Sequence, residues 1–389
     1  GISDGGGYAD QMGDYNKIGL DCSGLARDFF TKEVAPRHEE FAAAGEPDRA
    51  LYRRAGDLGL LLMSIPEEFG GGGATFAHEA VLFREQAYAG DLSMQLGVHA
   101  GIVPHYLNAY AAPEQKQRWL PKLASGEWIG AIAMTEPGTG SDLQAISTRA
   151  VRVGDEYVIS GAKTFISNGA TCDLIIIAAK TDPQQGAAGL SLFAAEVRDD
   201  TAGFQRGRKL KKIGQKGQDT TELFFDELRV PAENLLGGIE GRGFVQLMQQ
   251  LPQERLIVGV AALGAVEAAY DHTLAYVKER HVFGKPLFAL QNTRFELAEI
   301  ATVIDVMRTF VDDAIQRHVR GDLDVKRAAQ VKLWCSDQQT QIVDRCLQLH
   351  GGYGYMEEYP ISRLFVDSRI SRIYAGANEV MKDLIARHL

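Results

Sequence analysis

Residues 256–277 read LIVGVAALGAVEAAYDHTLAYV and carry a clear helical pattern. The apolar side chains recur at spacings of three and four, at Leu256, Val260, Leu263, Val266, Tyr270, Leu274 and Val277. This period places one apolar stripe along a helix. The pattern therefore predicts a long, buried helix that ends near Arg280.

The rest of the C-terminal part predicts three more helices. A second stripe follows the same spacing at Leu297, Ile300, Ile304, Met307, Val311 and Ile315. A third helix begins after Asp322 or Asp324, either of which could cap it, and runs to about Leu349, and a last one begins near Asn378. Four helices with apolar stripes can bury one another as a bundle.

The N-terminal part has the same helical texture but is more often interrupted. Helical segments at 25–41, 50–63 and 76–87 are separated by Pro36, by Pro66 with the glycine run 70–73, and by Pro104 and Pro113. Proline lacks a backbone donor and glycine is conformationally free, so both residues tend to end helices. We expect short helices joined by turns.

The middle part predicts strands. Short β-prone runs occupy residues 156–160, 163–166, 174–178, 190–195 and 223–228. Gly154–Asp155 and Asn168–Gly169 suit hairpins between them. The expected fold is α+β and mostly α, with an N-terminal helical domain (1–128), an antiparallel β-barrel domain (129–240) and a C-terminal four-helix bundle (241–389).

Composition excludes several classes of function. The 389 residues include 51 acidic and 41 basic side chains, a formal charge of -10 that argues against a broad nucleic-acid surface. The longest apolar run, residues 256–266, is shorter than the ~18 residues of a membrane span. The first twelve residues do not resemble a secretory signal. The four cysteines form no CxxC pair, which favours a reducing compartment and no metal site.

The glycine-rich motifs do not predict a nicotinamide or nucleotide site. GxGxxG fails twice, because Leu143 follows Gly138-Thr139-Gly140 and Gln246 follows Gly241-Arg242-Gly243 where the third glycine belongs. No GxxxxGK[ST] motif is present. Gly351–Gly354 follows a helix rather than a strand, so it is typical of a helix end.

Three further motifs can each be explained as turns or surface residues, but their combination is more informative. Residues 132–142, IAMTEPGTGSD, place hydroxyls and an acid in a turn between helical and β segments, which in isolation is an ordinary turn. Residues 350–355 read HGGYGY, and Glu279-Arg280, FGKP at 283–286 and Gln291 lie between. In order and spacing this set resembles the acyl-CoA dehydrogenase family, above all its long-chain members, over residues 18–389.

The resemblance implies a flavin enzyme of the fatty acid β-oxidation type. Such an enzyme oxidises an acyl-CoA thioester to the trans-2-enoyl-CoA: a base removes the α proton and the β hydrogen leaves as hydride to N5 of FAD. It also implies a homotetramer that passes electrons to an electron-transferring flavoprotein. We expect it in the cytoplasm of a bacterium, or in the mitochondrial matrix of a eukaryote.

The predicted base is Glu254. Most relatives carry a glutamate in the motif that reads IYAGANE at 373–379, but alanine at 375 cannot accept a proton. In a minority the glutamate lies on an earlier helix, which LPQERL at 251–256 resembles. A lone glutamate on a helix is usually solvated, yet Glu254 precedes an apolar run, where burial would raise its pKa. Glu379 and Glu136 are the next candidates.

The resemblance also implies the binding residues. The flavin would contact Ile132, Ala133, Met134, Thr135, Gly140, Ser141, Phe165, Ile166 and Ser167. FAD of this or a neighbouring subunit would be held by Arg280, Phe283, Gln291, Gln348, Leu349, His350, Gly351, Gly352, Ala377, Asn378 and Glu379. Acyl-CoA would contact Ser141, Val245, Pro252, Gln253, Arg255, Ala375 and Gly376. Phe165 and Ala377 replace a tryptophan and a threonine common in the family.

Two alternative functions and one local feature stay open. An acyl-CoA oxidase would return electrons to oxygen, and a catalytically dead acyl-CoA-binding scaffold is compatible with Ala375. The basic run Arg206, Arg208, Lys209, Lys211 and Lys212 is most simply a solvated hairpin face. Alternatively it attracts the CoA phosphates.

Overall fold

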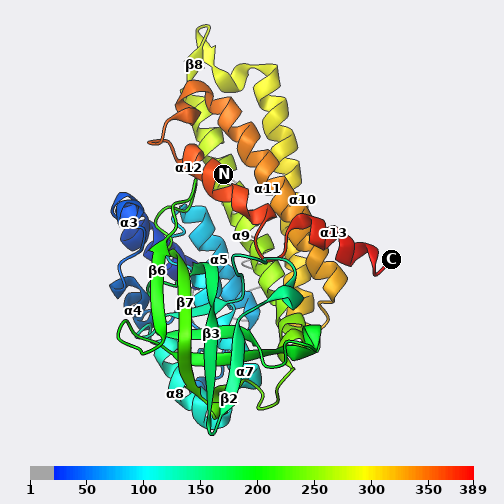
Figure 1. The fold of residues 1–389 in the computed structure, drawn as a ribbon. Helices are drawn as coiled ribbons and strands as arrows, with labels where there is room; N and C mark the ends of the chain where they lie inside the picture. Colours follow the sequence, from blue (N-terminus) through cyan, green and yellow to red (C-terminus); the bar gives the residue numbers. More distant parts are fainter. Residues whose placement is uncertain (1–21) are drawn as a thin grey trace.

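The computed structural model describes residues 22–389, so the expectation about a secretory signal lies outside the described residues. N-terminal helices, a sheet and long C-terminal helices follow one another along the chain (Figure 1). The sheet lies in the lower half of the view, in front of the N-terminal helices. The long C-terminal helices rise above it.

The N-terminal helices confirm the expected helical texture but not every break. Pro36 lies inside a run of helical turns from Cys22 to Ala44, in the first turn of η3, where a missing N–H has little cost. Pro104 and Pro113 likewise begin helices instead of ending them. The elements are α2 (Cys22–Asp28), η2 (Phe29–Val34), η3 (Ala35–Arg37), α3 (His38–Ala44), α4 (Ala50–Asp57), α5 (Phe76–Ala89), α6 (Leu96–His99), α7 (Val103–Tyr110) and α8 (Pro113–Ala124).

The middle part forms a seven-stranded mixed sheet in the order β1-β4-β2-β3-β7-β6, with β5 also on β4. The prediction of a purely antiparallel sheet is wrong, because β1 runs parallel to β4 and β2 meets β4 in parallel at its end. The strands are β1 (Gly130–Ala133), β2 (Arg149–Val153), β3 (Glu156–Ser167), β4 (Leu174–Lys180), β5 (Leu190–Glu196), β6 (Phe204–Lys209) and β7 (Thr220–Pro231).

One of the two predicted hairpins is confirmed. Gly154, at φ +65°, joins β2 to β3 with Val153 opposite Glu156. Asn168–Gly169 follows β3, but β3 pairs with β2 and β7 and not with β4, so this turn makes no hairpin. β1 and β2 lie one after the other along the same edge of β4, and the segment between them, residues 134–148, leaves the sheet.

The C-terminal helices follow the predicted stripes closely. The Asp324 side chain accepts the Arg327 N–H at 2.7 Å and caps the third helix, and Gly351, at φ +63°, ends it. α12 was not predicted. The elements are α9 (Gly243–Glu279), β8 (His281–Val282), β9 (Lys285–Pro286), α10 (Gln291–Arg320), α11 (Val325–His350), η9 (Gly351–Tyr355), α12 (Pro360–Ser368) and α13 (Asn378–Ala386).

α9 is the central helix of the structure. It packs against α5 from the N-terminal part and against α10 and α11, while α12 and α13 pack on α11. Gly259 lets α9 and α11 approach closely, since a Cβ there would lie 2.5 Å from Val331 Cγ1. One apolar core joins the N- and C-terminal helices to one face of the sheet, and a second fills the other face.

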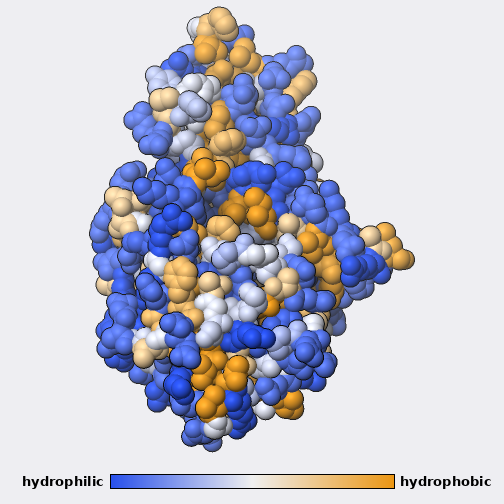
Figure 2. Space-filling view, viewed as in Figure 1, coloured by the Kyte–Doolittle hydropathy of each residue, from blue (hydrophilic) through white to orange (hydrophobic). Residues whose placement is uncertain are grey.

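Two further findings concern the described residues as a whole. No helix within residues 22–389 is long and apolar enough to cross a membrane. The cysteines Cys22, Cys172, Cys335 and Cys346 are all free and buried. Figure 2 shows mostly polar residues on this face, with a group of apolar residues where the upper helices meet the lower body.

Candidate active site

A buried ion pair holds the segment after β1. The Lys163 Nζ lies 2.8 Å from Glu136 Oε2 and donates to Met134 O at 3.0 Å, and both side chains are almost fully buried. Burial alone would raise the pKa of Glu136, but Lys163 and donors on Ser147 and Thr148 outweigh it and hold this pKa at about 2. Glu136 is therefore a poor base at neutral pH.

Phe165 lies beside this segment, and together with Met134, Thr135 and Ser167 it forms an exposed surface that we call the platform. The pairing of β3 with β7 shifts register between Lys163 and Ile166, and within this bulge Phe165 adopts φ +56° with 66% of its surface exposed. The neighbouring Thr164 N–H donates to Thr135 O at 2.9 Å. Positive φ at a non-glycine residue is strained and often marks a functional site. The platform offers an aromatic face and the partly exposed Met134, Thr135 and Ser167.

Two of the residues predicted to contact the flavin have buried side chains. Ala133 and Ile166 are buried in the core on one face of the sheet, because alternate residues of a strand point to opposite faces. Their side chains cannot reach a ligand on the platform. Ile132 is partly buried, and Gly140 and Ser141 are exposed directly after a turn that Glu136 and Thr139 close through two backbone hydrogen bonds.

Glu254 lies on α9 with only part of its side chain exposed. Desolvation raises the pKa of its carboxyl to about 7, although the Arg255 charge opposes the shift. Two tyrosines lie close enough for the Glu254 charge to affect their pKa. Burial, and then the Glu254 charge, raise the pKa of Tyr106, and the same two causes raise the pKa of Tyr374 to about 12. The pKa of Glu254 is thus near the pH at which a general base works best.

The loop that carries Ala375 is held against α9 and α11. Ala375 and Gly376 adopt φ +56° and +86°, and the buried Arg255 guanidinium lies beside Gly376. The fully buried Lys332 of α11 donates to Gly376 O at 2.9 Å and to Asn378 Oδ1 at 2.8 Å. Sequence reasoning missed Lys332, although a lysine among the apolar positions of a predicted helix was a usable signal.

The side chains of Asn378 and Gln253 are engaged within the protein. The Asn378 side chain donates to Ser336 and Asp337 and accepts from Lys332. The predicted contact of Asn378 with FAD would therefore be made by its backbone. The side chain of Gln253, which is predicted to contact acyl-CoA, bonds to Gly101 and His318. Among the other predicted acyl-CoA contacts, Val245 is exposed and Pro252 is partly buried.

A second group of predicted FAD residues lies at the far end of α9. The Arg280 guanidinium stacks 5.3 Å above the Tyr353 ring, and Phe283, 93% exposed at φ +51°, forms the tip of the β8–β9 hairpin. Exposed residues of this group are Gln291, Gln348, Gly351 and Gly352, Leu349 is partly buried, and His350 is buried against Tyr276. In Figure 1 the hairpin is at the opposite end of the molecule from the sheet.

The distance along α9 separates this group from Glu254. Glu254 and Arg280 are 26 residues apart, or roughly 40 Å at 1.5 Å per residue. The structure therefore does not bring all the predicted FAD contacts together within one chain. Of the remaining predicted residues, Ala377 and Glu379 lie beside Asn378 at the start of α13, with Glu379 exposed and Ala377 partly buried.

The basic run is largely engaged by the protein itself. Arg206 pairs with Asp199 and donates to Gly169 O and Cys172 O, and Arg208 pairs with Glu222. Lys209 pairs with Glu46, and Lys212 donates to Gln218 O and Thr220. Four of its five cations thus already have acceptors within the protein, and both interpretations of the run stay predictions.

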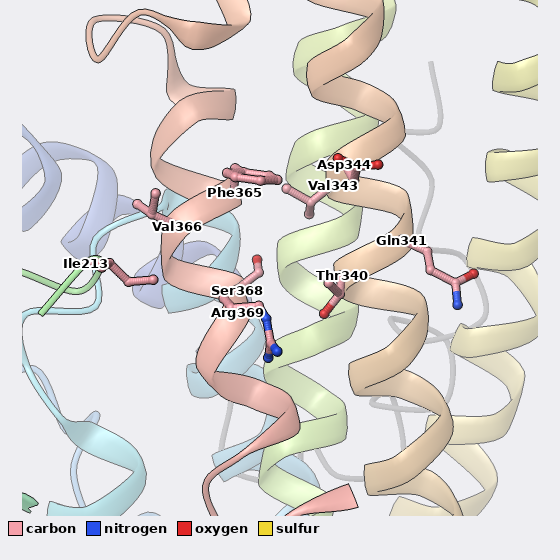
Figure 3. A pocket seen from close by; sticks show the side chains of 9 residues that line it. All are labelled: Ile213, Thr340, Gln341, Val343, Asp344, Phe365, Val366, Ser368 and Arg369. Carbon is pink, nitrogen blue, oxygen red and sulfur yellow. The ribbon is translucent and has the colours of Figure 1, made fainter.

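Figure 3 shows a cavity of about 380 Å³ between α11, α12 and the loop after β6. Phe365 points towards Val343 across it, and Ile213 approaches from the loop. The other lining residues are Thr340, Gln341, Asp344, Val366, Ser368 and Arg369. None of the predicted site residues lines this cavity, so it is distinct from the region around Glu254.

A sheet between two helical regions, a partly buried glutamate on α9 and a strained, exposed aromatic side chain are the features that the comparison with known proteins must match. Three sequence models match: acyl-CoA dehydrogenase N-terminal domain (residues 22–127), middle domain (131–228) and C-terminal domain (241–389). The chain belongs to the acyl-CoA dehydrogenase family. Members of this family are FAD-dependent enzymes.

Individual relatives support the same assignment. The chain is 45% identical over 365 residues to the mitochondrial long-chain specific acyl-CoA dehydrogenase of Rattus norvegicus, covering 93% of this chain and 84% of that protein. An acyl-CoA dehydrogenase structure from Geobacillus kaustophilus shares 46% identity with a TM-score of 0.91, over 94% of this chain and 96% of that one. A Mycobacterium smegmatis glutaryl-CoA dehydrogenase in complex with FADH2 shares 26% with a TM-score of 0.88, over 95% and 93%.

Proposed function

We propose that the protein converts an acyl-CoA thioester to the trans-2-enoyl-CoA with Glu254 as the base, as a step of fatty acid oxidation. The observation that carries this proposal is the partly buried Glu254 carboxyl on α9, whose charge acts on Tyr106 and Tyr374 and whose own pKa burial raises to about 7. The alternative position for a base is Ala375, which cannot take a proton. A partly buried carboxyl with a raised pKa also argues against a catalytically dead scaffold.

The residues of the chain divide the reaction between them. The Glu254 carboxylate accepts the α proton, while the β hydrogen leaves with its electron pair. FAD, when bound, supplies the acceptor for those two electrons. Negative charge grows on the thioester oxygen as the α proton leaves, and the backbone of the Ala375–Gly376 turn is the proposed neighbour of this oxygen. Lys332 holds that turn through Gly376 O.

The residues on the platform suit a flavin ring. Phe165 offers an open aromatic face in a conformation that costs energy, and Thr135 and Ser167 add hydroxyls beside it. Because Arg280 lies roughly 40 Å along α9 from Glu254, and Phe283 lies in the hairpin that follows, we assign both to the FAD of a neighbouring subunit. A homotetramer is the assembly we propose, with an electron-transferring flavoprotein as the electron acceptor.

We further propose a long-chain acyl group as substrate, in line with the 45% identity to the long-chain specific enzyme. The proposed domains are 1–128, 129–240 and 241–389, with the sheet as a small barrel and the last helices as a four-helix bundle. Matches of the family's sequence models to 22–127, 131–228 and 241–389 support these boundaries. The mitochondrial relative favours the matrix in a eukaryote, and bacterial relatives favour the cytoplasm.

Anaerobic titration with acyl-CoAs of increasing chain length tests the proposal. The purified protein should be yellow, and its flavin absorbance should bleach, most readily with long chains. A colourless protein would contradict the enzyme, and a yellow protein that no acyl-CoA bleaches would favour the scaffold. Bleaching followed by stoichiometric peroxide release in air would identify an oxidase.

A further inference from the structure

We infer that Gln253 and His318 are positioning residues for Glu254, and that together they fix the rotation of the α9 turn that carries this carboxyl. The inference rests on the proposed function, since it takes Glu254 as the proton acceptor. It assigns a role to two residues that touch neither the platform nor the Ala375 turn.

The position of Gln253 in the helix explains why it can act on Glu254. Successive residues of an α-helix point about 100° apart, so holding the Gln253 side chain sets the direction of the next one. Pro252 precedes it inside α9 and has no N–H, so the carbonyl of Met248 lacks its usual helical partner. This turn of α9 is short of one backbone hydrogen bond, and a side-chain connection can restore its rigidity.

Gln253 connects α9 to two other parts of the protein. Its Nε2 donates to Gly101 O at 2.7 Å, and its Oε1 lies 2.8 Å from His318 Nε2 on α10. Gly101, between α6 and α7, is tightly packed, because a Cβ there would lie 2.5 Å from Ile257 Cδ1. The acceptor carbonyl therefore cannot easily move, and Gln253 itself is only 9% exposed.

The chemistry of these partners determines their orientation. A carbonyl oxygen only accepts, so the amide nitrogen of Gln253 faces Gly101 and the amide oxygen faces His318. His318 must then carry its hydrogen on Nε2 and donate it. The imidazole is a fixed donor that selects one orientation of the Gln253 amide.

The surroundings of His318 keep it neutral. Its ring packs edge-on against Phe76 at 5.0 Å, and burial lowers the pKa of His318 to about 4, with His105 adding to the effect and Glu79 opposing it. His105 is itself bonded to Glu79 at 3.0 Å. At neutral pH His318 thus positions Gln253 by a hydrogen bond and adds no charge near Glu254.

Flavin-loaded variants test the inference by anaerobic stopped-flow reduction with a long-chain acyl-CoA. Gln253→Leu should slow reduction at saturating substrate by at least about tenfold, with less than about threefold change in KM, because a small displacement of a base is costly. His318→Leu should match it, whereas His318→Gln, which can present an N–H near the Nε2 position, should recover most of the rate. If Gln253→Leu loses its flavin, the comparison of the reduction rates of His318→Leu and His318→Gln tests the inference.

Gln246→Leu is the matched control. Gln246 is a buried glutamine of α9 that donates to Leu236 O at 3.0 Å, eight residues before Glu254. Its loss should lower stability and leave the reduction rate unchanged. Wild-type rates in Gln253→Leu, equal rates in the two His318 variants, or a Gln246→Leu rate as low as that of Gln253→Leu would each overturn the inference. The proposed function fails separately, if wild type does not bleach or Glu254→Gln bleaches normally.

Discussion

The Lys163 ammonium lies 2.8 Å from the Glu136 carboxylate with both side chains almost entirely removed from water. This pair connects β3 to the segment that follows β1, next to the exposed Phe165. Two buried charges gain from each other only when their geometry is good, and removing one leaves the other unpaired. The pair therefore determines how the platform is built.

Lys163→Met should lower the free energy of unfolding by about 3 kcal/mol, because it leaves Glu136 charged and buried. Urea denaturation of the flavin-loaded protein measures this, with flavin retention as a second readout. Lys209→Met is the control: Lys209 pairs with Glu46 at 2.9 Å near the surface, where such pairs contribute about 1 kcal/mol or less. Equal losses of unfolding free energy in the two variants would show that the buried pair contributes no more to stability than a surface pair.

Glu254→Gln should reduce turnover by about 10²-fold to 10⁴-fold while the protein stays yellow. The amide keeps the size of the side chain and cannot accept the proton. Steady-state turnover with an artificial electron acceptor, together with the flavin spectrum, measures both. Glu114→Gln is a suitable control, since Glu114 is exposed on α8 and belongs to none of the predicted contacts. Glu379→Gln tests the alternative base in the same assay, with its flavin spectrum recorded. If Glu379→Gln is the inactive variant, the base has been misassigned.

The pH dependence of flavin reduction should reflect the raised pKa of Glu254. With this pKa at about 7, the carboxylate forms as pH rises, so kcat/KM should increase from pH 6 and level off above about pH 8. The contribution of Glu254 to the free energy of unfolding should decrease as pH rises. A folded-state pKa above the unfolded value of ~4.3 favours folding at low pH and loses that advantage as pH rises through 7. Glu254→Gln should therefore melt higher than wild type at pH 8 and not at pH 5.

Phe165→Gly should separate stability from cofactor binding. Glycine adopts positive φ without strain, so the apoprotein should be at least as stable as wild type, while flavin affinity should fall because the aromatic face is gone. Phe224→Gly provides the opposite case: this exposed phenylalanine lies in β7, and the variant should lose up to about 1 kcal/mol but keep its flavin. Flavin binding and apoprotein melting are measured in both. Tight flavin binding by Phe165→Gly would remove the platform from the site.

Lys332→Met should weaken use of the substrate. The Ala375–Gly376 turn loses its hydrogen bond from a buried ammonium, so kcat/KM for acyl-CoA should fall by about tenfold or more. Lys382→Met, an exposed lysine on α13, should behave as wild type. The two variants are compared by initial rates over a range of acyl-CoA concentrations. A Lys332→Met enzyme with normal kcat/KM and only reduced stability would limit Lys332 to a structural role.

The helices of this protein were predictable because their signals are local. Leu256, Val260 and Leu263 lie within two turns of one another, and Asp324 caps the helix that begins at the next residue. The parallel contact of β1 with β4 depends on residues 44 positions apart, Gly130 and Leu174, and no neighbouring residue signals it. Local periodicity thus predicts elements better than it predicts their pairing.

The site shows the same division. The Glu254 prediction needed a family resemblance, since an isolated glutamate on a helix is more often solvated. Lys163 and Lys332 were missed because their acceptors lie 27 and 44 residues away, although the apolar neighbours of Lys332 on its helix did indicate burial. Gln253 was assigned to the substrate from the resemblance, and its bond to His318 could not be predicted because it depends on α10 lying beside α9.

α9 continues without interruption from Pro252 to Glu279, and this has a mechanical consequence. Over roughly 40 Å, a tilt of about 5° about one end displaces the other by about 3 Å. Because the bonds of Gln253 to Gly101 and His318 hold the Glu254 end, such a tilt would displace Arg280 and leave the proton-accepting carboxyl almost in place. α9 would thus pivot near Gln253, so that movement at the Arg280 end does not reach the base.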